Sequence, residues 1–181
     1  MNLTVVAEDI TKLKDIEVLV NPANGIGVMG AGVAGAINKS GGKYIKDEAR
    51  KMYFDRGSPF NTGDVYATTS GLMKRRNIDK IYHAVTMQYP GGRTSLEVID
   101  KCLTSIFIKA RAEGVQTLGL PGLGTGIGGL DKEMVAQKMY GKILSYGHYF
   151  KSITVADMSE EFINYFKKLD KQRQENDQQS I

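Results

Sequence analysis

Cysteine, histidine and tryptophan are scarce in this chain, which has one cysteine, two histidines and no tryptophan in 181 residues. A single cysteine, Cys102, excludes an intrachain disulfide framework and suits a reducing compartment. The two histidines, His83 and His148, lie far apart in the sequence and form no metal-ligand spacing with that cysteine. We therefore expect a cytoplasmic protein with no metal and no cofactor.

Long apolar runs are also missing, so no segment is long enough to span a bilayer. The N-terminal residues 1–6 alternate polar and apolar side chains like a strand and lack the features of a signal peptide. The formal net charge of +4 favours anionic ligands only mildly. The short basic run at residues 74–76 is more typical of a solvated turn than of a nucleic-acid patch. We expect no membrane partner, one domain over residues 1–170, and a polar, frayed tail over residues 171–181.

Short apolar segments alternate with segments of helical periodicity along the chain. Leu96, Ile99 and Leu103, for example, recur at three- and four-residue steps and form one apolar face. Alternating strands and helices predict a layered α/β fold with a mixed or mostly parallel sheet. The predicted strands are Leu3–Ala7, Glu17–Asn21, Asp64–Thr68, Lys80–Val85, Thr117–Leu120 and Ser152–Ala156. The predicted helices are Gly32–Asn38, Lys43–Arg56, Thr94–Glu113, Asp131–Gly147 and Ser159–Lys171, with caps at Thr94 or Ser95, at Asp131 and at Ser159.

Glycine is in excess, with 21 residues, and it concentrates in two loops that follow predicted strands. The first loop spans Asn21–Val33 and the second spans Pro121–Gly129. Glycine has no Cβ, so successive backbone N–H groups can turn toward one closely approaching ligand. A helix that starts just downstream adds positive dipole character. Two such loops at the carboxyl ends of strands predict one site that holds a diphosphate from both sides, as in a nucleotide-type ligand.

Each loop contains a literal G-x-G-x-x-G motif, at residues 25–30 and 124–129. The dinucleotide-binding fold also needs an acidic residue about twenty positions later, at the end of the next strand. Asp47 and Glu48 lie near that distance from the first loop, but inside a predicted helix, which disfavours a nicotinamide cofactor. An isolated glycine loop is more often a tight turn with no ligand. Two long loops after strands make that interpretation the less favoured one here.

Several motifs, in the same order along the chain, resemble the signature of the macro domain family. Asp9-Ile10-Thr11 resembles the family's G-D-I-T motif, Val20–Asn24 its V-N-A-A-N motif and Gly30–Ile37 its G-G-G-V-x-x-A-I motif. Ile81–Val85 is similar to its I-x-H-x-V strand, and Gly124–Gly129 to its later T-G-I-x-G loop. The resemblance extends roughly from Leu3 to Phe166. It implies a three-layer α/β/α sandwich around a mixed, mostly parallel sheet, with ADP-ribose bound in a cleft over the sheet.

The resemblance also implies roles for individual residues. Asp9 would accept the adenine amino group beside Ile10, or alternatively cap a short helix that starts near Thr11. Asn24 would contact the distal ribose, or alternatively form an Asx-type turn. Adenine would pack on Met158 or Phe162, although Phe162 also fits a core position. The backbone would clamp the diphosphate, with Ile127 covering the cleft; the clamp residues are Gly30, Ala31, Gly32, Val33, Gly124, Thr125, Gly126, Ile127 and Gly128.

The usual catalytic residues of the family are replaced in this sequence. Ala34 stands where many hydrolytic members carry an acid, and Met29 where a histidine is common. A different subgroup uses a lysine and an aspartate at the positions of Met87 and Gly128. The catalytic mechanism that the resemblance still allows uses a water activated by the substrate's own phosphate. Asn24 would be its one catalytic residue and would position the ribose.

Four functional hypotheses stay open. The first is a protein that binds ADP-ribose or a derivative and hydrolyses ADP-ribosyl linkages or ADP-ribose 1″-derivatives. The second is a non-catalytic reader of ADP-ribosylation, which the alanine at position 34 favours. The third is a nicotinamide-dependent oxidoreductase, which rests on the glycine motifs alone, and the fourth is an RNA- or protein-binding scaffold. The expected partner is ADP-ribose or an ADP-ribosylated macromolecule, with nucleic acid left open.

Overall fold

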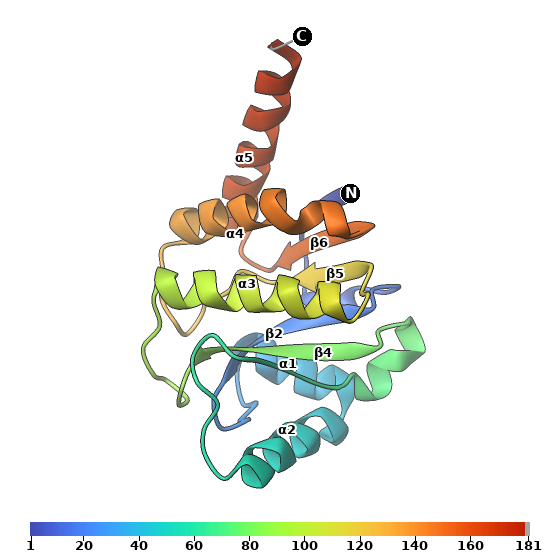
Figure 1. Ribbon diagram of the computed structural model, residues 1–181, viewed down its shortest axis with the longest axis vertical. Helices are drawn as coiled ribbons and strands as arrows, with labels where there is room; N and C mark the ends of the chain where they lie inside the picture. The colour runs from blue at the N-terminus through green and yellow to red at the C-terminus, as the bar shows by residue number, and fades with distance from the viewer. Residues whose placement is uncertain (180–181) are drawn as a thin grey trace.

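The computed structural model describes residues 1–179 and arranges them around a six-stranded sheet (Figure 1). The strand order is β1-β6-β5-β2-β4-β3. Neighbouring strands pair in parallel except at one edge, where β3 is antiparallel to β4. This arrangement confirms the mixed, mostly parallel sheet that the sequence predicts. The strands are β1 (Asn2–Ala7), β2 (Val18–Asn24), β3 (Val65–Thr69), β4 (Lys80–Met87), β5 (Thr117–Leu120) and β6 (Ser152–Asp157).

Helices cover both faces of this sheet (Figure 1). On one face lie α1 (Gly32–Gly41) and α2 (Lys43–Arg56), and on the other lie α3 (Leu96–Ala112), α4 (Lys132–Tyr146) and α5 (Glu160–Gln179). The division follows the alternation of side chains along β2. Val18 and Val20 pack with α3, α4 and α5, while Leu19 packs with α1 and α2. The result is the three-layer α/β/α sandwich that the resemblance implied.

Side-chain caps start three of these helices as predicted. Ser95 Oγ accepts from the N–H of Val98 at 3.2 Å at the start of α3. Asp131 Oδ1 accepts from Met134 at 2.9 Å, and Ser159 Oγ accepts from Phe162 at 3.3 Å. Each cap satisfies a backbone donor that the helix itself leaves unpaired.

Strand β2 extends beyond Asn21, where the sequence analysis predicted its end. The ladder with β4 continues through Pro22 and Ala23 to Asn24. Proline donates no backbone hydrogen bond and is usually confined to positions where a ladder is open on one side. Beyond Leu19, β2 has no partner on its β5 side, so proline interrupts no ladder there.

Two further segments differ from the prediction. The expected turn around the basic run at residues 74–76 is the 3-10 helix η2 (Gly71–Arg76). Helix α5 continues to Gln179, past the predicted end at Lys171. Ion pairs and hydrogen bonds one turn apart stabilise its last turns, and they join Lys171 to Glu175, Arg173 to Asp177, and Gln174 to Asp170. Residues 180 and 181 of the predicted tail lie outside the described residues.

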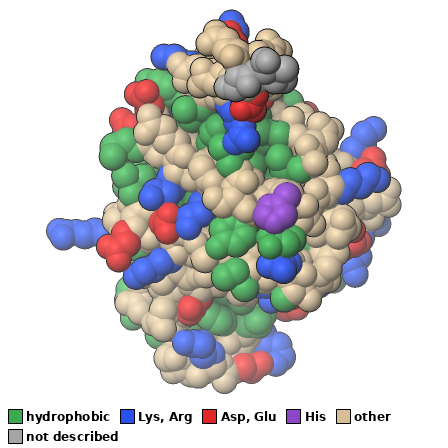
Figure 2. Space-filling view, turned by 45° about the horizontal axis from the view of Figure 1, so that its top comes forward, with side chains coloured by type: hydrophobic (Ala, Val, Ile, Leu, Met, Phe, Trp, Pro, Cys, Tyr) green, Lys and Arg blue, Asp and Glu red, His purple; other side chains and the backbone are tan. Residues whose placement is uncertain are grey.

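Charged side chains of both signs lie among hydrophobic ones on the face shown in Figure 2. Within residues 1–179, none of the helices combines the length and the apolar character that crossing a membrane requires. The exposed end of α5 carries only polar and charged residues after Leu169, so this part of the helix buries no apolar face.

A buried histidine forms a polar link between three strands. His83 of β4 is fully buried, and its Nδ1 lies 3.1 Å from Nδ2 of Asn21 in β2. Its Nε2 lies 2.8 Å from Oγ1 of Thr68 in β3, and its ring stacks on Tyr66 at 4.8 Å. Since the Asn21 amide donates to Nδ1, the ring proton resides on Nε2 and is donated to Thr68. Burial lowers the pKa of His83 to about 3, so the ring is neutral and structural.

This burial predicts a pH-dependent stability. Below its ordinary pKa of 6.5, the imidazole takes up a proton in the unfolded chain but not in the folded protein, whose His83 pKa is about 3. The free energy of unfolding should therefore fall as the pH is lowered, by about 2 kcal/mol between pH 7 and pH 5. Urea denaturation at several pH values measures this change. His83→Gln should be less stable at pH 7 and show a flatter profile; an unchanged slope would contradict the assignment.

Candidate ligand-binding site

The sheet opens between the neighbouring strands β2 and β5. These strands pair only through Val18 with Leu118 and through Leu19 with Gly119, whereas β2 stays paired to β4 as far as Asn24. The carboxyl ends of β2 and β5 therefore separate, and each leads into one glycine-rich loop. A cavity of about 610 Å³ lies at this opening, a size typical of ligand pockets.

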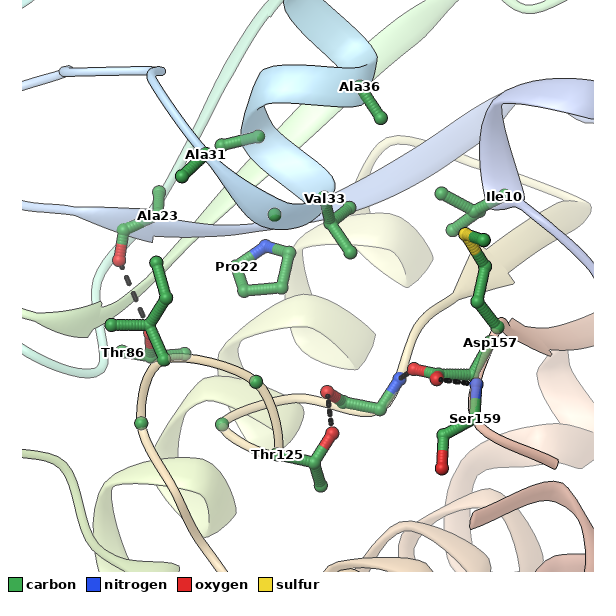
Figure 3. Close-up of a pocket in the computed structure, with 18 of the residues that line it drawn as sticks. Ile10, Pro22, Ala23, Ala31, Val33, Ala36, Thr86, Thr125, Asp157 and Ser159 are labelled. Carbon is green, nitrogen blue, oxygen red and sulfur yellow. Dashed lines mark hydrogen bonds between the residues drawn. The ribbon is translucent and has the colours of Figure 1, made fainter. Parts of the chain in front are cut away.

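Both glycine-rich loops line the cavity. Figure 3 shows Ile10 and Val33 on one side of it and Thr125 on the other. The structure brings together almost all of the residues that the sequence assigned to binding, although their contacts with a ligand stay a prediction. The lining includes Asp9, Ile10, Asn24, Gly30, Ala31, Gly32, Val33, Gly124, Thr125, Gly126, Ile127, Gly128 and Met158.

Phe162 is the exception among these residues. Its side chain is fully buried in the core between the sheet and helices α3, α4 and α5. A Cβ added at Gly122 would lie 3.3 Å from the Phe162 ring, which therefore packs beneath the second loop. The helical turn that follows Ser159 directs Phe162 inward, and adenine packing on its ring is excluded by the fold.

Asn24 holds the first loop in shape from inside the cavity. Its Oδ1 accepts from the N–H groups of Ile26 and Val28 at 3.2 Å, and its Nδ2 donates to the Val28 carbonyl at 2.9 Å. These bonds give the Asx-type turn that the sequence left as an alternative. Behind the loop, Arg50 Nη1 donates to the Ile26 carbonyl at 2.5 Å. Gly27 lies so close to the backbone of α2 that a Cβ would come within 2.8 Å of a carbonyl oxygen.

Helix α1 begins at the cavity without a side-chain cap. Ala31 occupies the N-cap position, and the first turn contains no acidic residue. In the part of the chain that the structure describes, the backbone N–H groups from Gly30 to Ala34 donate no hydrogen bond. Free N–H groups and the helix dipole together favour an anion at this point. Gly32 has a φ of 59°, which disfavours other residues.

Asp157 fastens the second loop to the end of β6. Its Oδ2 accepts from the N–H of Gly122 at 2.9 Å, and its Oδ1 accepts from Ser159 at 2.8 Å (Figure 3). Thr125 Oγ1 donates to the Gly122 carbonyl at 2.9 Å. A Cβ at Gly122 would lie only 2.9 Å from Asp157 Oδ2 and from Thr125 Oγ1, so this close approach requires glycine.

The second loop, like the first, presents free backbone donors. Over residues 1–179, the N–H groups from Thr125 to Gly128 donate no hydrogen bond. Ile127, at the tip, is 65% exposed. The cavity is thus bordered by two sets of backbone N–H groups, one from each loop.

Acidic and apolar residues meet at the end of the cavity formed by β1 and β6. Asp9 Oδ1 accepts from the N–H and the Oγ1 of Thr11 at 2.9 and 2.8 Å, so Asp9 caps the 3-10 helix η1 (Ile10–Lys12). Both of these bonds use the same carboxylate oxygen. Ile10 is buried, Met158 is 76% exposed, and Glu8 completes this part of the lining.

The opposite end of the cavity, formed by β2 and β4, contains no ionisable side chain among the described lining residues. Met87 lines the cavity at this end, and Ala34 lines it along α1. Met29 is buried behind them. The ionisable lining residues are Glu8, Asp9, Asp157 and Lys132. Asp157 is held by two backbone N–H groups, and Lys132 pairs with Glu161 at 3.1 Å.

Cys102, the remaining reactive side chain, lies on α3 in the core. Burial raises the pKa of its thiol to about 12, so the thiol is protonated at neutral pH and is not a nucleophile. Among residues 1–179, no three or more histidine, cysteine, aspartate or glutamate side chains are grouped so that they could hold a metal ion.

Several lining residues were missed by the sequence analysis. They follow or end a strand at the edge where the cavity lies, and that position was the available signal. Thr86, for example, donates from Oγ1 to the Ala23 carbonyl at 3.3 Å (Figure 3). Asp157 and Ser159 were missed likewise, and Lys132, at the start of α4, was missed without such a signal.

Solved structures of macrodomains share this fold. The Oceanobacillus iheyensis macrodomain with ADP is similar with a TM-score of 0.83 and 24% identity, over 96% of this chain and 92% of that one. The Trypanosoma brucei macrodomain in complex with ADP-ribose has a TM-score of 0.76 and 21% identity, over 92% of this chain and 67% of that one. At these identities the similarity shows the fold.

Sequence comparison gives the family. A family model described as Macro domain matches residues 20–139. An uncharacterized protein of Aquifex aeolicus is 33% identical over 170 residues, which are 93% of this chain and 98% of the relative. An uncharacterized protein of Aeropyrum pernix is 35% identical over 136 residues, which are 75% of this chain and 67% of the relative.

The contacts of Asp157 predict that it stabilises the second loop. We expect Asp157→Ala to lower the free energy of unfolding by about 2 kcal/mol, because two backbone N–H groups lose a charged acceptor. Exchange of the Gly122, Gly129 and Leu130 amides, whose N–H groups donate hydrogen bonds in this loop, should become faster. Asp177→Ala, which breaks an exposed pair on α5, is the matched control and should cost about 0.5 kcal/mol or less. Equal effects of the two substitutions would contradict the assigned role.

Proposed function

The chain belongs to the macro domain family, and on this premise we propose that it binds ADP-ribose in the cavity between its two glycine-rich loops. The macrodomains of similar fold are described with ADP and with ADP-ribose. The chemistry of the cavity, at its centre and at both of its ends, supports ADP-ribose binding by this chain.

The free backbone donors on both loops are the observation that carries the proposal. The uncapped start of α1 offers N–H groups from Gly30 to Ala34, and the second loop offers those from Thr125 to Gly128. A diphosphate has anionic oxygens on two adjacent phosphorus atoms, so one ligand group can satisfy both sets at once. Glycine at positions 30, 32 and 126 lines the cavity, and the space beside each is open, since an added Cβ would meet no atom within 4 Å.

The end of the cavity at β1 and β6 suits an adenine base. Asp9 uses one carboxylate oxygen to cap η1, and its other oxygen is the proposed acceptor for the adenine amino group. Ile10 and Ala156 supply apolar surface to one face of the base, and the exposed Met158 supplies a flexible cover to the other. Asn24 and Thr86 at the opposite end of the cavity would then lie near the distal ribose.

We propose that binding proceeds without turnover, so that the protein reads ADP-ribosylation on a macromolecule. The cavity end near the distal ribose is lined by Asn24, Val28, Thr86, Met87 and Pro90, none of which titrates near neutral pH. The Asn24 amide is already engaged with its own loop. We also propose a cytoplasmic site of action, which suits the free, buried thiol of Cys102.

Titration calorimetry with ADP-ribose, ADP and NAD tests the binding proposal. We expect preference for ADP-ribose, and a loss of at least about 100-fold in affinity for Gly126→Glu. The new carboxylate would occupy the space between the two loops and repel the diphosphate, while the fold tolerates it because Gly126 has open space around its Cα.

Gly141→Glu on α4 is the matched control for this experiment. It makes the same charge change at another exposed glycine with no atom within 4 Å of an added Cβ, away from the cavity. Its affinity for ADP-ribose should equal that of the parent protein. Tighter binding of NAD than of ADP-ribose, or full affinity in a folded Gly126→Glu protein, would refute the proposal.

An assay of ADP-ribose release tests the absence of turnover. We expect that protein incubated with mono-ADP-ribosylated substrates, or with ADP-ribose 1″-phosphate, retains them without releasing free ADP-ribose. Chromatography of the mixture measures release directly. Release that disappears in Gly126→Glu but persists in Gly141→Glu would instead establish hydrolysis in the cavity.

A further inference from the structure

Three segments that are far apart in the sequence form one continuous surface. Residues 11–15 follow β1, residues 39–46 join α1 to α2, and residues 71–77 contain η2. Arg76 Nη2 donates to the Thr11 carbonyl at 2.5 Å, and the N–H of Asp15 donates to the Arg76 carbonyl at 2.9 Å. Leu72 lies against Gly42, where an added Cβ would be 3.3 Å from its side chain. We call this surface the basic face.

The basic face contains eight basic residues and one acidic residue. Asp15 is the one acid within the three segments, and its carboxylate accepts a hydrogen bond from Asn77. Asp47 and Asp79 flank the face. All of the basic side chains are exposed except that of Arg76, which is half-buried. The basic residues are Lys12, Lys14, Lys39, Lys43, Lys46, Lys74, Arg75 and Arg76.

None of these eight side chains takes part in an ion pair within the described chain. The ion pairs lie elsewhere, chiefly along α3, α4 and α5. The three segments carry seven net positive charges, and the whole chain carries four, so the remainder is net negative by three. The positive charge of this protein is therefore concentrated on one surface, as in proteins that bind polyanions.

Exposed apolar side chains interrupt the charges on this surface. Tyr44 is 54% exposed and Leu72 is 43% exposed, and a Cβ added at Gly42 would lie within 3.6 Å of both side chains. Lysine and arginine side chains neutralise phosphates, and an exposed aromatic ring lets an unpaired base stack on it. An anionic membrane surface would use the charges without a need for a stacking ring.

We propose that the basic face binds a single-stranded nucleic acid through its phosphodiester backbone, with one base stacked on Tyr44. Residues 39–46 and 71–77 of the face are distinct from the cavity and line no part of it, whereas residues 11–15 begin directly after the lining residue Ile10. At the first of these segments, α1 spans the distance from the cavity to the face. Its N-terminus lines the cavity, while Lys39 lies in its last turn, about 10 Å further along the helix axis. The proposal does not rest on ADP-ribose binding, and both sites can be occupied at the same time.

Fluorescence anisotropy with a labelled 20-nucleotide single strand of mixed sequence tests the proposal. Lys43→Glu/Lys74→Glu/Arg75→Glu should lower the affinity at least about tenfold and flatten its dependence on salt. The matched control, Lys151→Glu/Lys167→Glu/Lys168→Glu, makes the same change in net charge at exposed lysines outside the face. It should stay within about threefold of the parent protein. An equal loss in both triple variants would overturn the assignment of the face.

Tyr44→Ala tests stacking separately from charge. It should lower the affinity for the single strand about tenfold at unchanged salt slope, and it keeps all eight basic residues. Equal binding of a duplex of the same length, or no effect of Tyr44→Ala, would refute the single-stranded assignment. Vesicles of phosphatidylcholine with phosphatidylserine serve as the other polyanion, and binding to them without binding to the oligonucleotide would also overturn it. Unchanged ADP-ribose titration in every variant keeps this test independent of the cavity.

Discussion

The early end of the ladder between β2 and β5 is the constraint on which the cavity depends. Two residue pairs hold these neighbours together, and beyond them each strand follows its other neighbour, β4 or β6. Had the ladder continued to Asn24, the space now occupied by the cavity would be closed sheet. Pro22 fits this arrangement because it lacks the N–H that a second ladder would use. Ligands generally bind beyond the carboxyl ends of parallel strands, and in this protein the cavity at that position results from the separation of β2 and β5.

Small residues and backbone N–H groups of the two loops line much of the cavity, and three side chains act on it through the loops that they hold. Asn24 closes the first loop on itself, Arg50 fixes it to α2, and Asp157 ties the second loop to β6. Preorganised N–H groups keep their direction without a ligand, so little ordering remains to be done on binding. Gly30, Gly32 and Gly126 line the cavity, and a Cβ added at any of them would meet no protein atom within 4 Å.

Sequence reasoning found the parts of this site whose signal is local. Glycine at the ends of strands marked both loops, and the caps of α3, α4 and α5 were readable from Ser95, Asp131 and Ser159. What it missed depends on pairing between distant segments. Whether Pro22 continues a strand depends on β4, and the role of Asp157 depends on Gly122, which lies 35 residues earlier in the chain. Whether Phe162 packs in the core or faces the cavity likewise depends on which side of α5 faces the sheet.

The cavity and the basic face would hold the proposed anions in two different ways, because their charges differ. Ionisable groups in the cavity lining are three acids and one lysine, and that lysine is paired with Glu161. Net charge therefore opposes an anion in the cavity, and only the fixed dipoles of the loops and of α1 can favour it there. Such dipoles act over a few ångströms and are little screened by salt. The basic face carries full, exposed charges that salt screens strongly. The affinities of the two sites should therefore depend differently on ionic strength. Added salt weakens the long-range attraction of the basic face but leaves the short-range fit of the cavity nearly unchanged.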